Sequence, residues 1–442
     1  MHQTIADWVD EHLQPAGYSQ PLRNQAALLI TGLVAGDQAT VSGLSRVLAR
    51  DQVSRAQEPS IARRILRLLD RCAFDPARVL PALFRSLLPE VLAGLVNAHT
   101  ANAGCRPRQH DRFRPVRLVI DETSQDDAVH ALVIGLWHQG LVLPLAVRVW
   151  PQNEPLPDGQ YWAELTSMLS EVQTELPPVL RDHVVLVADR GYGHARFIDL
   201  VTSLGWAWVV RCTGQVRVQW PDGREQPLRE LVAEPGQSWQ AQTGLPDPTG
   251  SDGEPGVRLA LFKKAGWRQC WVVGMWLPQQ SEPWLLMTNR AATAERLQDY
   301  ARRWAIERLF LSWKSHGWHL EAGRVRDAAR VGRLISGLVV ATWWRFAAAQ
   351  PAIQAELDRL AGRRRFAEAE QLPLPLGPAS PLPPRDRRPW PAKFSLLTWG
   401  WRAIQDTDRR RMTPPLTWSL PAEADFPAWP QRGTAAARGV PT

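Results

Sequence analysis

Residues 300–318 read YARRWAIERLFLSWKSHGW, and we expect the rest of the chain to be arranged around this stretch. On an α-helix each residue advances by about 100°, and one narrow polar stripe then contains Tyr300, Arg303, Glu307 and Lys314. The opposite arc predicts a core-packing face made of Ile306, Leu309, Phe310 and Trp313. A single carboxylate flanked by cations suits a metal ligand beside a phosphate-binding row. A solvated face with an ordinary Arg303–Glu307 pair is the alternative.

Composition favours an acidic partner and excludes several classes of protein. The net charge is +8 and the isoelectric point about 9.8, and residues 301–366 alone carry a Lys and Arg excess equal to that of the whole chain. No run of eighteen apolar residues predicts a membrane span, and no export signal is recognisable. The cysteines lack zinc spacing and are expected to be reduced in the cytoplasm: Cys72, Cys105, Cys212 and Cys270.

The first 112 residues are predicted to be helical, with helices at 25–35, 41–49, 59–71 and 79–98. The pair at 41–49 and 60–69 is rich in arginine and is compatible with a helix-turn-helix DNA reader. A small structural bundle with its arginines in water explains the same pattern, and the sequence leaves both interpretations open.

The pattern changes to mixed α/β after residue 113. Strands are predicted at 117–123, 129–137, 141–150, 183–189 and 206–212, with helices at 158–176 and near 195–204. A GxGxxG fingerprint is absent, which argues against a dinucleotide fold. The runs RLVIDET and HVVLVAD carry Asp121 and Asp189 at or near their ends, where ligands collect in open α/β sheets.

The remaining segments are predicted to be an insertion and a C-terminal region. Short strands with Gly, Pro and Asp turns fill residues 216–288, including a loop tip at 244–256. A long apolar helix is expected at 327–348, a proline-rich linker at 371–395 and a short helix at 394–411, followed by a poorly ordered tail from 413.

Three acids therefore come from two strands and one helix: Asp121, Asp189 and Glu307. Carboxylate oxygens suit Mg²⁺ or Mn²⁺, and two such ions about 4 Å apart catalyse in-line phosphoryl transfer. Without a metal the three would repel one another and raise at least one pKa. His316 and His319 have no third ligand nearby in sequence, and the chain has no P-loop and no GxSxG.

These residues resemble the bacterial insertion-sequence transposases of the DDE type. Their signature Y-(2)-R-(3)-E-(6)-K is met without a gap at Tyr300, Arg303, Glu307 and Lys314, and DRGY at 189–192 is similar to the pattern around their second acid. The resemblance covers roughly residues 115–345. The long spacing between the last two acids is similar to that of the cut-and-paste branch, which has a β-domain inserted there.

The resemblance implies a ribonuclease-H-like catalytic core at 113–215 and 289–349 with the all-β insertion at 216–288. A helical DNA-binding domain at 1–112 and a helical, proline-rich region at 350–442 would flank it. It implies metal binding by the three acids and binding of transposon-end phosphates by Tyr300, Arg303 and Lys314. Trp284 and Trp304 fall where the family stacks a flipped base, and truncating Trp284 is expected to leave the fold largely intact.

The implied function is cleavage at the ends of an insertion sequence and joining to target DNA, with two metal ions. The partners would be the terminal inverted repeats and target DNA, with a homodimer forming on synapsed ends in the bacterial cytoplasm, at the nucleoid. A structure-selective nuclease would need the acids but not the Tyr300–Arg303–Lys314 row. A domesticated, non-catalytic DNA-binding protein would be expected to lack an acid, and all three are present.

Overall fold

A computed structural model describes residues 1–102, 115–125, 128–138, 140–154, 156–240, 259–370, 396–409, 415, 416 and 418. The predicted loop tip at 244–256, the proline-rich linker and most of the tail lie outside the described residues, as does Cys105. Among the helices that are described, none is both long and apolar enough to cross a bilayer.

One mixed sheet passes through the molecule in the order β3-β2-β1-β4-β5-β11-β10-β9-β6-β7, with β8 paired to β10. Its first part consists of β1 (Val116–Gln125), β2 (Val129–His138), β3 (Leu141–Pro151), β4 (Val184–Ala188) and β5 (Ala207–Arg211). The first three strands are antiparallel neighbours, whereas β4 runs parallel to β1 and β5 parallel to β4. This is the strand order of a ribonuclease-H-like core, and the predicted fold class is confirmed.

The β2–β3 hairpin has one position that only glycine can fill. The register shifts between Ile134 and Gly135, and a Cβ on Gly135 would lie 2.3 Å from a methyl group of Val142. The strands can approach this closely because no side chain separates them.

The register of β1 against β4 places the two predicted acids together. The parallel pairing runs from Val116 opposite Val184 to Ile120 opposite Ala188, so Asp121 and Asp189 are the next residues on the two strands. The sequence placed the end of the first strand at 123, but β1 continues to Gln125 because β2 still pairs with it on the other side. Asp121 therefore lies inside a strand, at the point where its parallel neighbour ends.

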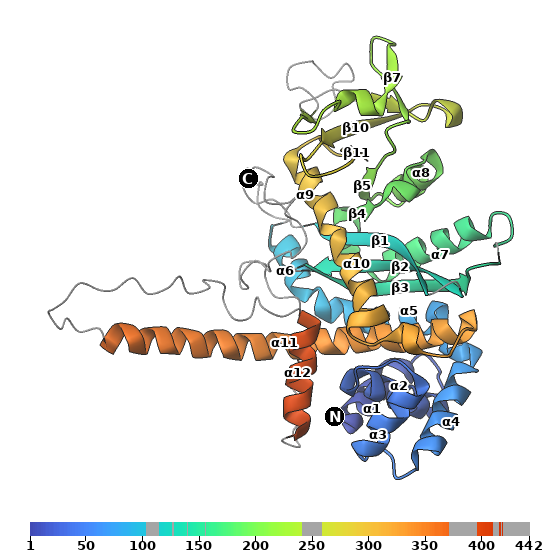
Figure 1. The fold of residues 1–442 in the computed structure, drawn as a ribbon, viewed down its shortest axis with the longest axis vertical. Coiled ribbons are helices and arrows are strands. Elements are labelled where there is room, and N and C mark those ends of the chain that lie inside the picture. Colours follow the sequence, from blue (N-terminus) through green and yellow to red (C-terminus); the bar gives the residue numbers. More distant parts are fainter. Residues whose placement is uncertain are drawn as a thin grey trace.

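The strands of the predicted insertion continue the same sheet. They are β6 (Arg217–Gln219), β7 (Glu225–Pro227), β8 (Ser238–Gln240), β9 (Leu259–Leu261), β10 (Arg268–Met275) and β11 (Trp284–Thr288). The link is β11, which is antiparallel to β5. In Figure 1 these strands form the upper part of the molecule, above the core strands.

The N-terminal region is helical, as predicted, and its first four helices lie below α11 (Ala328–Glu370) in Figure 1. Its helices are α1 (His2–Leu13), α2 (Gln20–Ala35), α3 (Val41–Arg50), α4 (Glu58–Leu69), α5 (Pro76–Val91) and α6 (Ala93–Asn102). The sequence did not predict α1, and the single helix expected at 79–98 is divided into α5 and α6.

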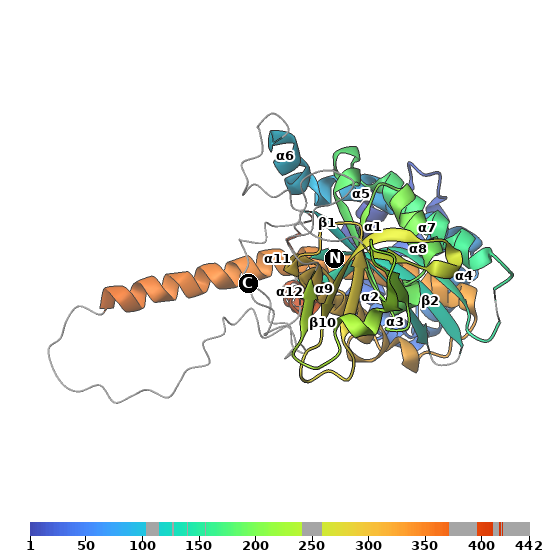
Figure 2. The ribbon, with the colours of Figure 1, turned by 90° about the horizontal axis from the view of Figure 1, so that it is seen from above.

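The other helices pack on the sheet or on one another. They are α7 (Gln160–Glu175), α8 (Ala195–Ser203), α9 (Ala294–Arg302), α10 (Trp304–Leu311), α11 (Ala328–Glu370) and α12 (Leu396–Arg409). The first part of α11 lies along β3 and α2. Its C-terminal part runs well beyond the predicted end at 348 and projects away from the rest of the molecule (Figures 1 and 2).

The sequence predicted one continuous α-helix for residues 300–318, but the structure divides this segment. The α-helical hydrogen bonding is interrupted at Arg303, between α9 and α10, and a π-helix at Ser312–His316 follows. The π-helix closes with a bond from the Gly317 N–H to the Ser312 carbonyl, and a Cβ on Gly317 would lie 2.6 Å from that oxygen. The predicted core face is confirmed, since its four apolar residues are all buried: Ile306, Leu309, Phe310 and Trp313.

The C-terminal end of α2 joins distant parts of the chain. A helix leaves its last carbonyls without intrahelical partners, and here side chains from three other segments donate to them. Trp318 donates to the Leu33 carbonyl at 2.7 Å, Arg345 to those of Leu33 and Gly36, and Gln405 to that of Ala35. Arg345 also places its positive charge at the negative end of the helix dipole.

We expect Arg345→Ala to destabilise the fold by about 3 kcal/mol, because it leaves buried carbonyls without a donor and opens a cavity. Arg330→Ala is the matched control, since Arg330 pairs with Asp70 on the surface, where such a pair contributes about 1 kcal/mol or less. Urea unfolding measures both. Equal losses in the two variants would contradict the role given to the α2 carbonyls.

Candidate active site

Three carboxylates surround the guanidinium of Arg303. Its Nη1 lies 2.7 Å from Oδ2 of Asp121, and its Nη2 lies 2.8 Å from Oε1 of Glu307. Asp189 lies close enough to raise the pKa of Arg303 as well, and it accepts a hydrogen bond of 2.9 Å from the Tyr300 hydroxyl. The structure therefore brings the predicted acids together, with a cation from the same signature between them.

The strands and helices that carry the three acids and Arg303 explain how these side chains meet. Alternate residues of a strand point to opposite faces, and Asp121 and Asp189 share the face on which α9 packs. Glu307 lies on α10, one helical turn after Arg303, so the two side chains meet at i,i+4 spacing. The Arg303 side chain is directed at Asp121 and Glu307, and only 6% of the residue is exposed.

The acids do not share one electrostatic environment. Burial raises the pKa of Asp121 to about 6, and the charges of Asp189 and Glu307 raise it too, against the opposing effect of Arg303. For Asp189 burial also favours the neutral form, but Arg303, the Arg190 N–H and the Tyr300 hydroxyl outweigh it, and the pKa is lowered. Arg303 therefore outweighs the effect of burial at Asp189, with the help of these hydrogen bonds, but not at Asp121.

The donor set matches a hard divalent cation, since all three side chains offer carboxylate oxygens. The charge matches as well, because a cation would favour the ionised form of Asp121, which burial disfavours and the charges of Asp189 and Glu307 disfavour further. In the present arrangement, however, no three His, Cys, Asp or Glu side chains among the described residues are grouped so as to hold one metal ion. Arg303 makes the contacts to Asp121 and Glu307 that a metal ion would make.

The predicted phosphate-binding row faces inward and not outward. Tyr300 is 1% exposed and bonded to Asp189, and Arg303 is held by two acids. Lys314 lies in the π-helix and has a longer ion pair, 3.8 Å, with Glu321. The helical wheel did not indicate this burial, because it places the residues on one stripe without showing what that stripe packs against.

The two predicted stacking tryptophans have different surroundings. Trp284 is 5% exposed and lies on β11, edge-on to the Tyr300 ring at 5.1 Å between centroids. Trp304 is 44% exposed, with the Arg303 guanidinium 5.8 Å from its ring. Only Trp304 presents a ring face that a base could reach in this conformation.

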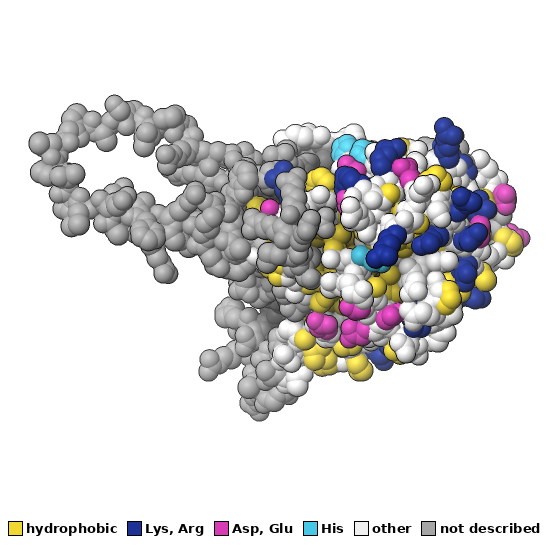
Figure 3. All heavy atoms as spheres, turned by 90° about the horizontal axis from the view of Figure 1, so that it is seen from below, with side chains coloured by type: hydrophobic (Ala, Val, Ile, Leu, Met, Phe, Trp, Pro, Cys, Tyr) yellow, Lys and Arg dark blue, Asp and Glu magenta, His cyan; other side chains and the backbone are white. Residues whose placement is uncertain are grey.

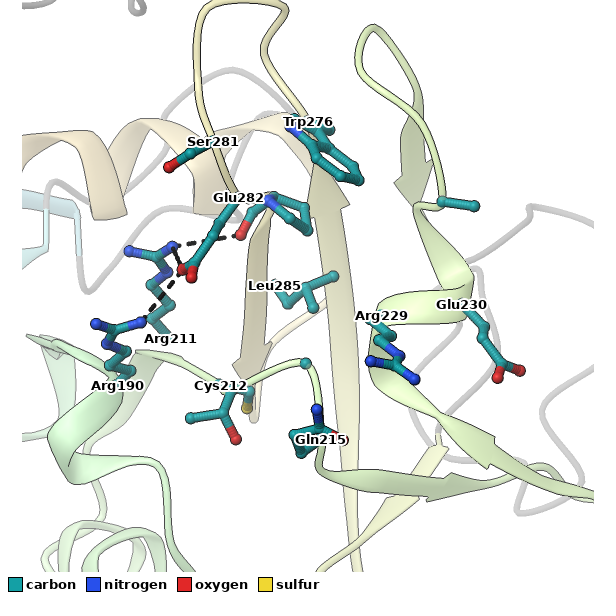
Figure 4. Close-up of a pocket in the computed structure, with 14 residues that line it drawn as sticks. Arg190, Arg211, Cys212, Gln215, Arg229, Glu230, Trp276, Ser281, Glu282 and Leu285 are labelled. Carbon is teal, nitrogen blue, oxygen red and sulfur yellow. Dashed lines mark hydrogen bonds and ion pairs between the residues drawn. The ribbon is translucent and has the colours of Figure 1, made fainter.

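A cavity of about 580 Å³ lies between the core and the inserted strands, next to the second acid (Figure 4). Arg190 follows Asp189 directly, Arg211 ends β5, and both point at Glu282, at 3.2 and 3.4 Å. The sequence analysis did not single out these two arginines. The position of Arg190 inside DRGY was the available signal, whereas the approach of Arg211 depends on the pairing of β5 with β11.

The N-terminal region carries a second basic surface. Figure 3 views the molecule from below and shows Lys and Arg side chains spread over the face to which α3 and α4 contribute. The arginines of these helices and their connection are exposed: Arg46, Arg50, Arg55, Arg63, Arg64 and Arg67. Both sequence interpretations, a DNA reader and a solvated bundle, are compatible with this exposure.

The raised pKa of Asp121 predicts how Asp121→Asn changes stability with pH. The folded wild type keeps the Asp121 proton up to about pH 6, but the unfolded chain loses it near 3.8, so this group's contribution to stability falls as pH rises through that window. In metal-free buffer we expect the variant to gain about 2.5 kcal/mol relative to wild type between pH 4 and pH 7.5.

Asp189→Asn is the matched control with the opposite sign. The pKa of Asp189 is lowered, so its ionised form stabilises the fold above the unfolded value and this contribution is lost on acidification. Thermal unfolding of both variants across the pH range checks the pair. Parallel curves would contradict the electrostatic difference between the two acids.

Trp284 and Trp304 differ in burial, so truncating them should have different effects. We expect Trp284→Ala to destabilise the fold by about 3–5 kcal/mol, which differs from the sequence-based expectation that the fold stays largely intact. Trp304→Ala should change stability by less than about 1 kcal/mol but weaken binding of a displaced base, where stacking contributes about 1–3 kcal/mol. Urea unfolding and binding of single-stranded DNA measure the two effects, and a large stability loss in Trp304→Ala would contradict this assignment.

The chain is similar to solved structures of a piggyBac transposase synaptic complex with hairpin DNA (10% identity, 77% of this chain, 72% of that chain, TM-score 0.37) and of human endonuclease V (15% identity, 57% and 98%, TM-score 0.22). No curated protein matches it. The model of the family described as Transposase DDE domain matches residues 158–344, a range that contains Asp189, Glu307 and the whole Tyr300–Lys314 signature.

Proposed function

We propose that the chain is a DNA transposase that cleaves at the ends of its own insertion sequence and joins those ends to target DNA. The observation that carries the proposal is the gathering of Asp121, Asp189 and Glu307 around one guanidinium. The match of residues 158–344 to a transposase DDE domain supports it, because that range holds two of the three acids.

The proposed cofactor is Mg²⁺ or Mn²⁺, as a pair of ions held by the three acids. Such ions, when bound, activate a water or a 3′-hydroxyl and stabilise the leaving oxygen. The chain supplies oxygen donors from β1, from the turn after β4 and from α10. The Tyr300 hydroxyl donates to one oxygen of Asp189 and thereby fixes the orientation of that carboxylate.

Arg303 has a second role in this proposal. As long as no cation is present, its guanidinium neutralises Asp121 and Glu307 and limits their repulsion. A divalent cation would compete for the same oxygens, so binding it requires Arg303 to release them. The released guanidinium is then available for a phosphate, which matches its planar donor geometry.

DNA is the proposed partner because several cations lie beside the acids. Arg190 and Arg211 are tied to Glu282, but Glu282 is largely exposed and its pairs are long, so they hold the arginines weakly. Lys314 is partly exposed as well. Cations that neutralise backbone phosphates supply most of the affinity for DNA, and we propose a homodimer when two ends are held together.

We expect Glu307→Gln to reduce strand cleavage at least about hundredfold with little change in DNA binding, because a metal ligand is lost and no cation is removed. The substrate is a duplex carrying the DNA that flanks the coding sequence. Mobility shift and nicking assays measure binding and cleavage. Glu295→Gln is the matched control, since Glu295 lies on α9 and pairs with Arg117 and Arg296 outside the site.

Two results would count against the proposal. Loss of DNA binding in Glu307→Gln as complete as in Arg303→Ala would make Glu307 a structural residue. Nicking without any joined product, with wild-type protein and both DNA partners present, would favour a nuclease.

A further inference from the structure

A second polar cluster lies behind the acids, on the opposite face of β1. Its centre is Glu122, which follows Asp121 and therefore points away from α9. One carboxylate oxygen, Oε1, accepts hydrogen bonds from Tyr161 at 2.5 Å and from Tyr192 at 3.1 Å. The other, Oε2, lies 2.6 Å from Nε2 of His130.

The partners of Glu122 come from three different elements. His130 lies on β2, where it pairs with Ser124 of β1, and its ring stacks on Trp150. Tyr161 lies in the first turn of α7, and Tyr192 ends the short 3₁₀ helix Arg190–Tyr192 that follows Asp189. The Glu122 carboxylate is thus the shared partner of side chains from β2, from α7 and from the 3₁₀ helix that follows Asp189.

Glu122 links the segments that carry the first two acids. On one side, its backbone N–H donates to Oδ1 of Asp121 at 2.9 Å. On the other, Tyr192 donates its hydroxyl to Glu122 and its backbone N–H to the Asp189 carbonyl, at 3.0 Å. Beyond Ile120 and Ala188 the parallel pairing has ended, so the register brings Asp121 and Asp189 level but no ladder bond joins these two residues, and the side-chain bridge ties their segments together a second time.

Simple packing does not explain a carboxylate at this position. Glu122 is only partly buried, with 28% of its side chain exposed, but an apolar side chain at this position would remove the acceptor of the Tyr192 and Tyr161 hydroxyls. Tyr192 is 5% exposed and packs on Phe197, so its hydroxyl is held in one place. Fully satisfied polar networks of this kind fix one arrangement of the chain.

We propose that Glu122 is a positioning residue that, through Tyr192, holds Asp121 and Asp189 at the separation their shared cation needs. The inference rests on the proposed metal site. It assigns no contact with DNA or metal to Glu122, and it predicts that the Tyr192 bond matters more for metal binding than the shorter Tyr161 bond, because only Tyr192 belongs to an acid-bearing segment.

The test compares Tyr192→Phe with Tyr161→Phe in the full chain, because each removes one hydroxyl from the same carboxylate oxygen. Mn²⁺ affinity is measured by electron paramagnetic resonance of free Mn²⁺, and Tm by thermal unfolding without metal. We expect Tyr192→Phe to weaken Mn²⁺ binding about tenfold, as for other residues that orient metal ligands, and Tyr161→Phe to leave it near wild type. The Tm shifts should be similar.

Cleavage assays add a kinetic readout. In Tyr192→Phe the Mn²⁺ concentration that gives half-maximal cleavage should increase by a larger factor than the rate at saturating Mn²⁺ decreases. Glu122→Gln keeps one acceptor oxygen, so it should increase the Mn²⁺ requirement less than Glu122→Ala does. Equal Mn²⁺ affinities in the two tyrosine variants would overturn the positioning role and leave the metal site standing. If Glu307→Gln binds Mn²⁺ as tightly as the wild type, the proposed metal site is overturned and this inference with it.

Discussion

Three carboxylates placed together repel one another, and the guanidinium of Arg303 makes their arrangement possible in the absence of metal. It contacts Asp121 and Glu307 directly and lowers the pKa of Asp189. At Asp121 burial outweighs the attraction of Arg303, and the pKa is still raised to about 6. A further cation would favour the ionised form of this carboxylate.

The fold supports this site from two directions. The β1–β4 register brings Asp121 and Asp189 level, and α9 and α10, which pack on these strands, bring Arg303 to Asp121. Further along the same segment, the π-helix delivers Trp318 to the C-terminal carbonyls of α2, where Arg345 also donates. The position of the last acid is therefore coupled to the N-terminal helices through hydrogen bonds and not only through apolar contact.

Much of this was readable from the sequence because it depends on local patterns. The β-branched runs predicted the core strands, the helical spacing predicted the buried face of residues 300–318, and the signature selected Glu307. Three features were not readable, because each depends on contacts between distant segments. The pairing of β1 with β2 carries the strand past Asp121, the packing of α9 buries Tyr300, and the approach of Tyr192 recruits Glu122.

The central claim is that the three acids form a cation site, and that Arg303 gives up its ion pairs with Asp121 and Glu307 when the cation binds. The most direct measurement is a crystal structure of the metal-free chain soaked in Mn²⁺, with anomalous scattering recorded at a wavelength where manganese contributes strongly. The account predicts a peak in contact with the carboxylates of Asp121 and Asp189, and a guanidinium withdrawn from Asp121. A crystal in which Arg303 keeps both of its ion pairs and manganese binds elsewhere, or not at all, would contradict it.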